Sequence, residues 1–441
     1  MRTVSYFGHQ FLLVTLAVLV GYAALVAAYS LPVGMMAPHM AASVRHFGDL
    51  YPQPVTGSGQ LDLFSDSVML LTSAHPNRGP AYRDALLGER YHKGDSPDSR
   101  ETMRDVYGEG AKPLPDGVRD IGYGRYWHGY TVLLKPLLCL TDYGTIRALN
   151  MFLQCALFAC VLLLCARRGE RPLGLAATFF WLAANPLATM LCLQFSAVTV
   201  ITLLGMACML LKKDDFAASE FAAARCFTLT GIAIAYFDLL SFPLLSLGLP
   251  LLFHFHLLDK SRLPLTALLR RLVLCGLSWL TGYAGMWLGK WILAWLIADP
   301  AIFDNVIAVM LFRTGHSVAG HEFTFADILL RQFGAAGWPV LALFALAMAG
   351  SVFLVRRQGG FAPDMKALTP CLLLTVMPFV WYAVMENHSY VHFWFTYRNL
   401  AIAGCGLLLL LFGAAKKSGL SSAAAGPADR IHAAGSRGAG Q

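Results

Sequence analysis

Two aspartates four positions apart, Asp62 and Asp66, stand in the stretch LDLFSDSVMLL of residues 61–71. If this stretch is helical, positions i and i+4 share a face, and the two carboxylates are neighbours. Two close acids beside an apolar surface differ in proton affinity, which leaves one of them suited to act as a general base. The alternative is a structural helix start, in which Asp62 or Ser65 caps the backbone.

A second cluster, ENHSYVHFWFTYRN at residues 386–399, combines cationic and aromatic side chains. His388 and His392 are four positions apart, and Arg398 follows them. Arginine grips a phosphate through two parallel hydrogen bonds, so the cluster suits a phosphate or pyrophosphate joined to a sugar ring. One alternative is an aromatic belt with interfacial histidines. Another is a divalent-metal site of His388, His392 and an acid, which no zinc-like motif supports; no cofactor is indicated.

Three further segments place ionisable residues among apolar ones. RYWHGYTVLLKPL contains His128 and Lys135, YFDLLSFP contains Asp238, and FRTGHSVAGHEF contains Arg313. An acid within a membrane is costly, which makes Asp238 a functional hypothesis, with a paired structural acid as the alternative. The segment around Arg313 has glycines on both sides of its histidines, so it either closes over a substrate or is a solvated connection.

Composition indicates a polytopic membrane protein. Of the 441 residues, 57% are hydrophobic and 14% are charged, and the mean hydropathy is +0.56, well above that of a water-soluble globule. The net charge of +8 reflects membrane topology in such a protein, so we expect no nucleic-acid partner. All ten cysteines lie in apolar stretches without a C-x-x-C pair, which predicts small buried residues and neither a disulfide framework nor a zinc site.

Apolar runs of about 20 residues predict membrane spans. We expect an all-α fold with about ten of them, near residues 10–30, 147–166, 172–188, 190–211, 224–239, 240–258, 272–296, 338–355, 367–385 and 398–413. The first run is longer than the apolar core of a signal peptide, which favours an uncleaved span. Residues 1–413 then form one transmembrane domain, with a first outer loop at about 31–146 that carries interfacial helices. The small-residue stretch 414–441 reads as a disordered tail.

Basic residues in short loops predict the orientation. Under this span count one side receives Arg167, Arg168, Arg171, Lys212, Lys213, Lys260, Arg262, Arg356, Arg357, Lys416 and Lys417. The positive-inside rule makes that side cytoplasmic, with both termini, in a plasma-membrane protein. The outer face then gathers Asp62, Asp66, His75, His128, Lys135, Asp238, Lys290, Arg313, His316, His321, Glu322, Glu386, His388, His392 and Arg398. Any chemistry is expected on this outer face.

This layout resembles that of the GT-C superfamily of integral-membrane glycosyltransferases, including bacterial membrane proteins of that broad group. The resemblance is architectural and extends over most of the chain. It is carried by LDLFSDSVML after the first span, RYWHGYTVLLKPLL at the end of the first loop, and YFDLLSFP and ENHSYVHFWFTYR on the same face. The chain departs from the usual pattern because its acids come well after the first span and form no adjacent Asp-Glu pair.

The resemblance implies transfer of a sugar from a polyprenyl-phosphate donor, with inversion, to an acceptor outside the membrane. A loop carboxylate, here Asp66 or Asp62, would deprotonate the acceptor hydroxyl. Positive charge would stabilise the leaving phosphate, and the candidates for this role are Lys135, Arg313, His388, His392 and Arg398. His128 and Asp238 join them as candidate residues for binding the substrate or its phosphate. The expected partners are the lipid-linked donor, membrane lipids and a glycan, lipid or protein acceptor of the cell envelope.

Two other functions remain open from the sequence. A transporter or flippase of a lipid-linked saccharide would share the spans and the basic interface, but it predicts polar residues along a path through the membrane and often paired repeats. A membrane acyltransferase would use outer-face histidines as bases and needs a nucleophile as well. The polar groups of this chain gather on one face, which favours the glycosyltransferase.

Overall fold

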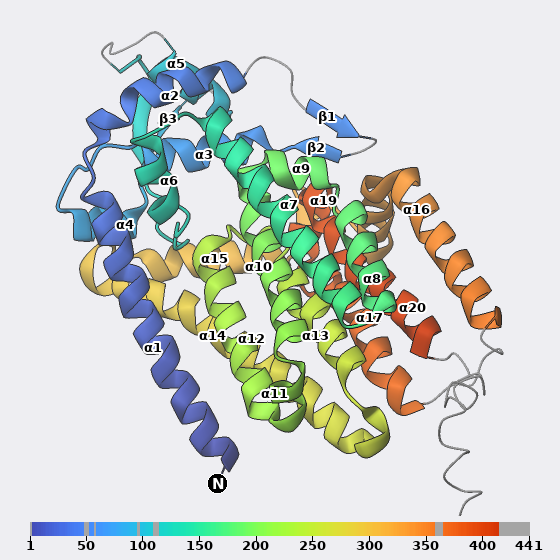
Figure 1. Ribbon diagram of the computed structural model, residues 1–441. Helices are drawn as coiled ribbons and strands as arrows, with labels where there is room; N and C mark the ends of the chain where they lie inside the picture. Colours follow the sequence, from blue (N-terminus) through green and yellow to red (C-terminus); the bar gives the residue numbers. More distant parts are fainter. Residues whose placement is uncertain are drawn as a thin grey trace, which may run out of the picture.

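Nearly every element of the chain is a helix (Figure 1). The computed structural model describes residues 2–47, 53–56, 59–94, 98–108, 114–357 and 365–413. In these residues, helices follow one another along the chain, with three two-stranded hairpins between them. The predicted all-α fold class is confirmed at this level. The stretch 414–441, predicted to be a disordered tail, lies outside the described residues.

The first third of the chain comprises one long helix and a domain of short elements. In order, these are α1 (Arg2–Tyr29), η1 (Val33–Met35), α2 (Ala37–Ser43), η2 (Val44–His46), β1 (Gln53–Thr56), β2 (Gly59–Leu61), α3 (Leu63–Ser73), α4 (Ala81–Leu87), β3 (Arg90–Lys93), α5 (Ser99–Tyr107), β4 (Val118–Ile121) and α6 (Thr131–Leu138). The strands pair antiparallel as β1–β2 and β3–β4. The elements from η1 to α6 are called the outer domain below.

Longer helices make up the rest of the chain. They are α7 (Tyr143–Arg167), α8 (Arg171–Ala183), α9 (Pro186–Leu191), α10 (Leu193–Leu211), α11 (Lys213–Ala218), α12 (Glu220–Phe237), α13 (Leu245–Leu257), η3 (Lys260–Arg262), α14 (Leu265–Ile297), α15 (Ile302–Thr314), α16 (Phe325–Arg357), α17 (Met365–Val384), α18 (Glu386–Val391), α19 (Phe393–Thr396), η4 (Tyr397–Asn399) and α20 (Leu400–Gly413). The hairpin β5 (Ser317–Val318) and β6 (His321–Glu322) follows α15.

Seven helices of the described chain are long and apolar enough to cross a membrane. They are Val4–Tyr29, Tyr143–Arg167, Leu193–Leu211, Glu220–Phe237, Leu265–Ile297, Phe325–Phe353 and Phe393–Gly413. This number is compatible with a polytopic membrane protein, but the predicted count of about ten is not confirmed. A helix of 20 residues is about 30 Å long, the thickness of the hydrocarbon core. Two of the remaining predicted spans form helices of only 13 residues, α8 and α13.

Local breaks shorten two of the three segments. The predicted span at 172–188 is divided into α8 and α9 at Asn185, whose positive φ of 57° and following proline end the helix. The predicted span at 240–258 begins as helix only at Leu245 and has 13 residues. The span predicted at 367–385 lies in α17, whose apolar part, Leu368–Val384, is just shorter than the shortest of the seven.

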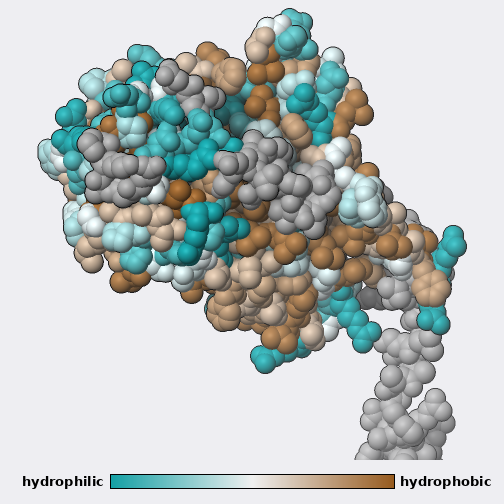
Figure 2. Space-filling model, turned by 90° about the horizontal axis from the view of Figure 1, so that it is seen from above, coloured by the Kyte–Doolittle hydropathy of each residue, from teal (hydrophilic) through white to brown (hydrophobic). Residues whose placement is uncertain are grey.

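The outer domain gathers hydrophilic surface at one end of the molecule. Seen from that end, hydrophilic residues cover much of the domain, whereas hydrophobic residues prevail toward the long helices (Figure 2). The segment predicted as an interfacial helix forms α6, which has eight residues and is too short to span. It exposes Leu133 with a relative accessibility of 57%, as suits a helix that lies along a membrane surface.

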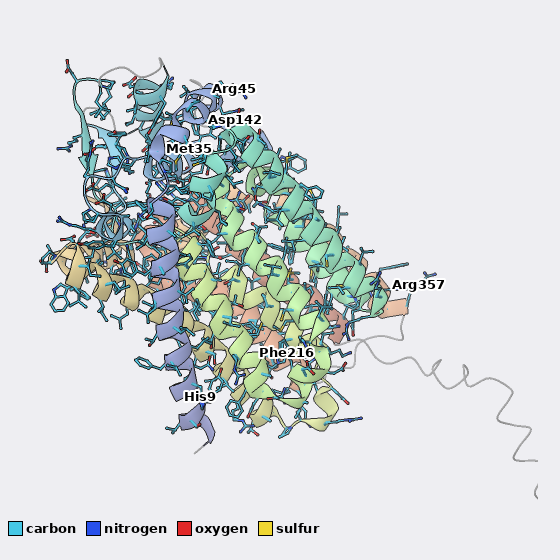
Figure 3. All side chains as sticks on the ribbon, turned by 60° about the vertical axis from the view of Figure 1, so that its left-hand side comes forward. His9, Met35, Arg45, Asp142, Phe216 and Arg357 are labelled. Atoms are coloured by element: carbon cyan, nitrogen blue, oxygen red, sulfur yellow. The ribbon has the colours of Figure 1, made fainter. Side chains whose placement is uncertain are left out.

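Ion pairs identify the two ends of the molecule. Arg45 of the outer domain pairs with Asp142, just before α7, at 2.7 Å, and both lie at the end opposite to His9 and Phe216 (Figure 3). At that opposite end Glu170 lies 3.6 Å from the Lys213 ammonium and pairs with a histidine near η3. The structure therefore brings together three of the basic loops that the sequence places on one side.

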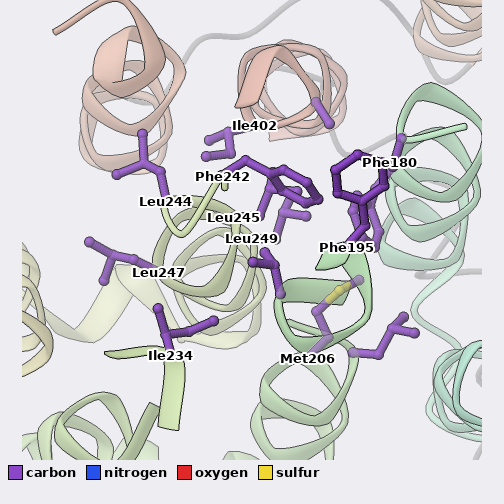
Figure 4. Packing of buried hydrophobic residues seen from close by; sticks show 14 of the residues in the cluster. Phe180, Phe195, Met206, Ile234, Phe242, Leu244, Leu245, Leu247, Leu249 and Ile402 are labelled. Atoms are coloured by element: carbon purple, nitrogen blue, oxygen red, sulfur yellow. The ribbon is translucent and has the colours of Figure 1, made fainter. Parts of the chain in front are cut away.

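The core lies among α8, α10, α13 and α20. Phe180, Phe195 and Phe242 pack beside Leu245 and Ile402 (Figure 4), and all five are fully excluded from solvent. Within a bilayer such close packing, rather than exclusion of water, holds helices together. This core supports the start of α10 and the turn that follows α12, and both contribute to the cavity described next.

Candidate functional site

A cavity of ≈ 240 Å³ lies where the outer domain meets the long helices. Segments far apart in the chain form its wall. The lining residues are Asp62, Phe64, Ser65, Val68, Tyr123, Tyr126, Gln194, Leu239, Leu240, Arg313, His388, His392, Trp394 and Phe395. Four residues predicted from the sequence as site residues therefore meet here, namely Asp62, Arg313, His388 and His392.

Asp62 caps α3 and faces the cavity. Its Oδ1 accepts a hydrogen bond from the backbone amide of Ser65 at 3.0 Å, the usual contact of an N-cap. Its Oδ2 accepts only a long contact, 3.4 Å, from the indole nitrogen of Trp394. Burial raises the pKa of Asp62, and a carboxylate with a raised pKa is a better proton acceptor once ionised. The structural and the catalytic predictions for Asp62 are thus compatible.

Asp66 lies outside the cavity lining. Its Oδ2 accepts from the Tyr143 hydroxyl at 2.5 Å and from the Leu193 amide at 2.8 Å, and its Oδ1 accepts from the Gln194 amide at 2.9 Å. These two amides are at the start of α10, so the carboxylate complements the positive end of that helix. Burial raises the pKa of Asp66 to about 6. All these contacts connect α3, α7 and α10, and none turns the carboxylate toward the cavity.

The two histidines carry no charge at neutral pH. Burial and then the Arg313 guanidinium lower the pKa of His388 to about 3. Burial, His388 and Arg313 lower the pKa of His392 to about 2. An Nη of Arg313 donates to Nε2 of His392, which requires the neutral ring to carry its proton on Nδ1. Among the lining residues, Asp62 and Arg313 are then the two that bear formal charge when ionised.

Several polar atoms of this wall are buried without a hydrogen-bond partner in the described chain. They belong to Gln194 (Oε1), Arg313 (Nε), His388 (both ring nitrogens) and His392 (Nδ1). His388 lies against the backbone of Leu240 and Ser241, but makes no hydrogen bond of normal geometry. Buried polar groups in native proteins nearly always have partners. Donors and acceptors left over around one cavity are therefore suited to a polar ligand.

An apolar groove of ≈ 380 Å³ adjoins the cavity. Three residues line both spaces: Tyr126, Leu240 and Arg313. The groove runs between α14, α15 and the end of α17, and its wall includes Leu280, Tyr283, Trp287, Trp291, Met310, Trp381 and Met385. Leu280 and Met310 are half exposed, so the groove opens toward the surroundings of the helices. The indole N–H of Trp381 has no hydrogen-bond partner among the residues that the structure describes.

The other predicted phosphate-binding residues bond backbone carbonyls instead of lining the cavity. The Lys135 ammonium donates to Ser73 O at 2.7 Å, and burial lowers the pKa of Lys135 to about 8. Arg398 donates through Nε to Ala184 O at 2.8 Å and lies over the Phe195 ring. Both cations are buried at the carboxyl ends of helices, where they complement the helix dipole.

His128 and Asp238 also have internal partners. Nε2 of His128 lies 2.8 Å from the carbonyl oxygen of Tyr123, so it carries the proton, and Nδ1 accepts from the Tyr130 hydroxyl. Burial lowers the pKa of His128 to about 3. Asp238 accepts from the amide and the hydroxyl of Ser241, and burial raises its pKa to about 6. Asp238 does not line the cavity, although the two residues after it do.

The remaining residues predicted on the outer face are dispersed. His75 pairs with Asp120 in the outer domain at 3.0 Å, and Lys290 donates to Leu86 O at 2.7 Å. His316, His321 and Glu322 are exposed at the β5–β6 hairpin. In the part of the chain that the structure describes, no group of three or more His, Cys, Asp or Glu side chains is placed to hold a metal ion.

Some cavity residues were not predicted from the sequence. Tyr126 and Trp394 stand within stretches that the sequence singles out, and an interfacial aromatic next to a cation was the available signal. Gln194 lies in no such stretch, and Leu240, although it lies in YFDLLSFP, has no chemical group that would have marked it. These two residues line the cavity because of the start of α10 and the turn after α12. Comparison of the chain with protein-family models, with curated proteins and with solved structures finds no match in any of the three.

Proposed function

We propose that the protein is a membrane glycosyltransferase that moves a sugar from a polyprenyl phosphate to an acceptor outside the membrane. One observation carries the proposal: a cavity that holds a carboxyl and a guanidinium shares three of its lining residues with an apolar groove. A lipid-linked sugar has the same three parts, an apolar chain, an anionic joint and a polar ring. The resemblance to GT-C enzymes suggests the reaction class, and the contacts of the lining residues support particular residues for its steps.

The groove accommodates the first part of the lipid chain. Its lining is almost wholly apolar, and its half-exposed rim allows a chain to enter from the bilayer. The cavity of ≈ 240 Å³ is smaller than the roughly 300–1,000 Å³ of sites for drug-sized ligands. This volume suits a single sugar ring, for which Tyr123, Tyr126 and Trp394 provide aromatic surfaces.

Arg313 would hold the phosphate, since it lines both spaces. A donor phosphodiester carries one negative charge, which one guanidinium balances. The charge on the phosphate grows as the bond to the sugar breaks, so a guanidinium placed there stabilises the transition state more than the ground state. The neutral histidines His388 and His392 add hydrogen-bonding groups without adding charge.

Asp62 would act as the base. It accepts the proton of the acceptor hydroxyl while that oxygen attacks the anomeric carbon from the side opposite to the phosphate. The bond from the anomeric carbon to the phosphate oxygen breaks, and its electron pair leaves with the phosphate, so the sugar is inverted. Asp66 stays a prediction for this role, but its oxygens already accept three hydrogen bonds. The geometry favours Asp62.

Transfer from a panel of polyprenyl-phosphate sugars tests the proposal, with the protein in nanodiscs. Asp62→Asn keeps the N-cap, because Asn caps as well as Asp, and we expect transfer to fall by about 10²–10⁴-fold, as for loss of a general base. Asp66→Asn places an amide N–H₂ against backbone donors, so it should lower stability by about 1–3 kcal/mol. Asp304→Asn, an exposed acid on α15, is the matched control with unchanged transfer.

Two results would count against this assignment. If Asp66→Asn stays folded and inactive while Asp62→Asn is active, Asp66 is the base. If no donor is bound or turned over by the wild type, the glycosyltransferase proposal fails. Translocation of a lipid-linked saccharide across the membrane of sealed vesicles that contain the protein would then support the transporter alternative.

A further inference from the structure

The turn between α12 and α13 contains a strained leucine. Leu240 has a φ of 64°, a left-handed conformation that glycine and asparagine adopt readily and leucine does not. Such a backbone costs about 1–2 kcal/mol for an L-residue with a full side chain. Strain of this kind persists only where the surrounding structure enforces it, so the contacts of the turn and the position of the side chain need an explanation.

Buried partners hold the turn on both sides. Asp238 accepts from the Ser241 amide at 2.9 Å and from the Ser241 hydroxyl at 2.5 Å, and its side chain is almost fully buried. His388 packs against the backbone of Leu240 and Ser241 from α18. Asp238, which the sequence suggested as a binding residue, therefore stabilises the conformation of this turn. It is a positioning residue for Leu240.

The strained conformation puts Leu240 between the two spaces of the site. Its neighbour Leu239 lines the cavity alone, whereas Leu240 lines both the cavity and the groove. The other two shared residues are Tyr126 and Arg313. A ligand that occupies both spaces must therefore pass the leucine side chain at the place where the guanidinium lies.

We infer that Leu240 determines specificity by fixing where the apolar chain of the ligand ends and its anionic joint begins. With the leucine in place, chain atoms stay in the groove and the anion comes to Arg313. Without the leucine side chain, apolar atoms of the ligand can enter the cavity, and the phosphate no longer lies next to the Arg313 guanidinium. This inference rests on the proposed function, because it takes the ligand to be a lipid phosphate.

The affinities of two probes test the role of Leu240. The probes are polyprenyl phosphate and the uncharged polyprenol of equal length, and each is titrated into nanodiscs that contain the protein. We expect the wild type to prefer the phosphate and Leu240→Gly and Leu240→Ala to lose about tenfold of that preference. Leu240→Gly relieves the backbone strain that Leu240→Ala retains. A cooperative unfolding transition with a higher thermal midpoint in the glycine variant than in the alanine variant therefore excludes misfolding as the cause. Leu239→Ala widens the cavity at an unstrained position and tests whether cavity size alone sets the preference. Leu229→Ala, at an exposed leucine of α12 outside both spaces, is the matched control and should keep the preference.

The possible results distinguish failure of the role of Leu240 from failure of the proposed function. If the wild type prefers the phosphate and both Leu240 variants keep that preference, this inference is wrong and the proposed function stands. If Leu239→Ala loses the preference as strongly as Leu240→Ala, cavity size rather than the partition is responsible, and the inference is again overturned. If the wild type does not distinguish the two probes, both the lipid-phosphate donor and the role of Leu240 fail.

Discussion

The ammonium of Lys135 lies 2.7 Å from the carbonyl oxygen of Ser73, the last residue of α3. Lys290 makes the same contact with Leu86 near the end of α4, and Arg398 does so with Ala184 at the end of α8. At helix starts the sign is reversed, with the Asp62 carboxylate at α3. Buried charges of this protein thus mostly complement helix dipoles, and few are left for chemistry.

The proposed role of Asp62 as the base predicts how the rate of transfer depends on pH. Asp62 must be ionised to accept a proton, and burial raises its pKa above the ordinary value. Activity should therefore fall as the pH falls through this raised pKa, and it should return as the pH rises. We expect kcat/KM to fall on the acid side with a single limb, and we expect His388→Gln to leave this limb in place. The reason is that His388, with a pKa of about 3, is already neutral over the pH range in which Asp62 titrates.

A profile of kcat/KM against pH for wild type and His388→Gln is the measurement. If the limb moves by a full pH unit in the variant, the histidine titrates with the reaction and Asp62 is not the group observed. A limb that is unchanged in Asp304→Asn, an exposed acid of α15, shows that the effect does not come from the general charge of the surface.

For single residues, the sequence could predict which side chains are candidates for the site, but not which of them face the cavity. ENHSYVHFWFTYRN and LDLFSDSVMLL both contribute to the cavity, as expected. Within each stretch, however, the choice of Asp62 over Asp66, and of His392 over Arg398, depends on partners more than a hundred positions away. Arg398 meets Ala184 and Asp66 meets Leu193, and no local pattern contains that information.

Among the elements, α12 and α14 approach each other at paired glycines. A Cβ on Gly231 would lie 2.2 Å from the carbonyl oxygen of Trp279, and one on Gly282 would lie 2.2 Å from that of Thr228. Only glycine permits such a distance between backbones. The crossing matters to the site because α12 leads into the strained turn and α14 forms a wall of the groove.

Alanine at either crossing glycine should therefore push the two helices apart. We expect Gly231→Ala and Gly282→Ala each to lower the thermal midpoint in nanodiscs and to weaken binding of the lipid probe. Gly276→Ala on α14 is the matched control, because a Cβ there meets nothing within 4 Å. That control should be neutral or stabilising by about 1 kcal/mol, since alanine favours helix. Equal effects at all three positions would contradict the close crossing.

The elements were largely predictable, because hydrophobic length is a local property of the sequence. Residues 147–166 and 272–296 lie within α7 and α14. The shorter helices were not predictable in the same way, since α13 follows the turn held by Asp238 and Ser241, and that turn takes up the first residues of the predicted span. Tertiary contacts, and not apolar composition, set where that helix begins.

For the whole molecule, the arrangement has two distinct ends. The outer domain lies toward the end marked by Arg45 and Asp142, and Phe216 lies at the other (Figure 3). Residues of the outer domain, among them Asp62 and Tyr126, line the cavity. Close to Phe216, Arg168 donates to Leu211 O at 3.3 Å, which brings two of the predicted basic loops together. The positive-inside rule then assigns the cavity to the outer side of the membrane, and this assignment is part of the proposal.

Single cysteines test this sidedness. In a chain whose ten native cysteines are replaced by serine or alanine, Arg119→Cys in β4 and Arg167→Cys at the end of α7 give two exposed positions. We expect an impermeant maleimide added to intact cells to label position 119 and to leave position 167 unlabelled until the membrane is opened. The reverse pattern would place the cavity on the cytoplasmic side and exclude an acceptor outside the membrane.

The two buried lysines have one more consequence, which concerns reagents rather than ligands. Lys135 and Lys290 are fully excluded from solvent, and each nitrogen is engaged by a carbonyl oxygen. An acylating reagent needs an accessible amine with a free electron pair, so neither lysine reacts while the fold is intact. Opening of the outer domain exposes Lys135, which donates to α3, and separation of α4 from α14 exposes Lys290. The order in which the two lysines become acylated during unfolding would therefore show which of these two contacts separates first.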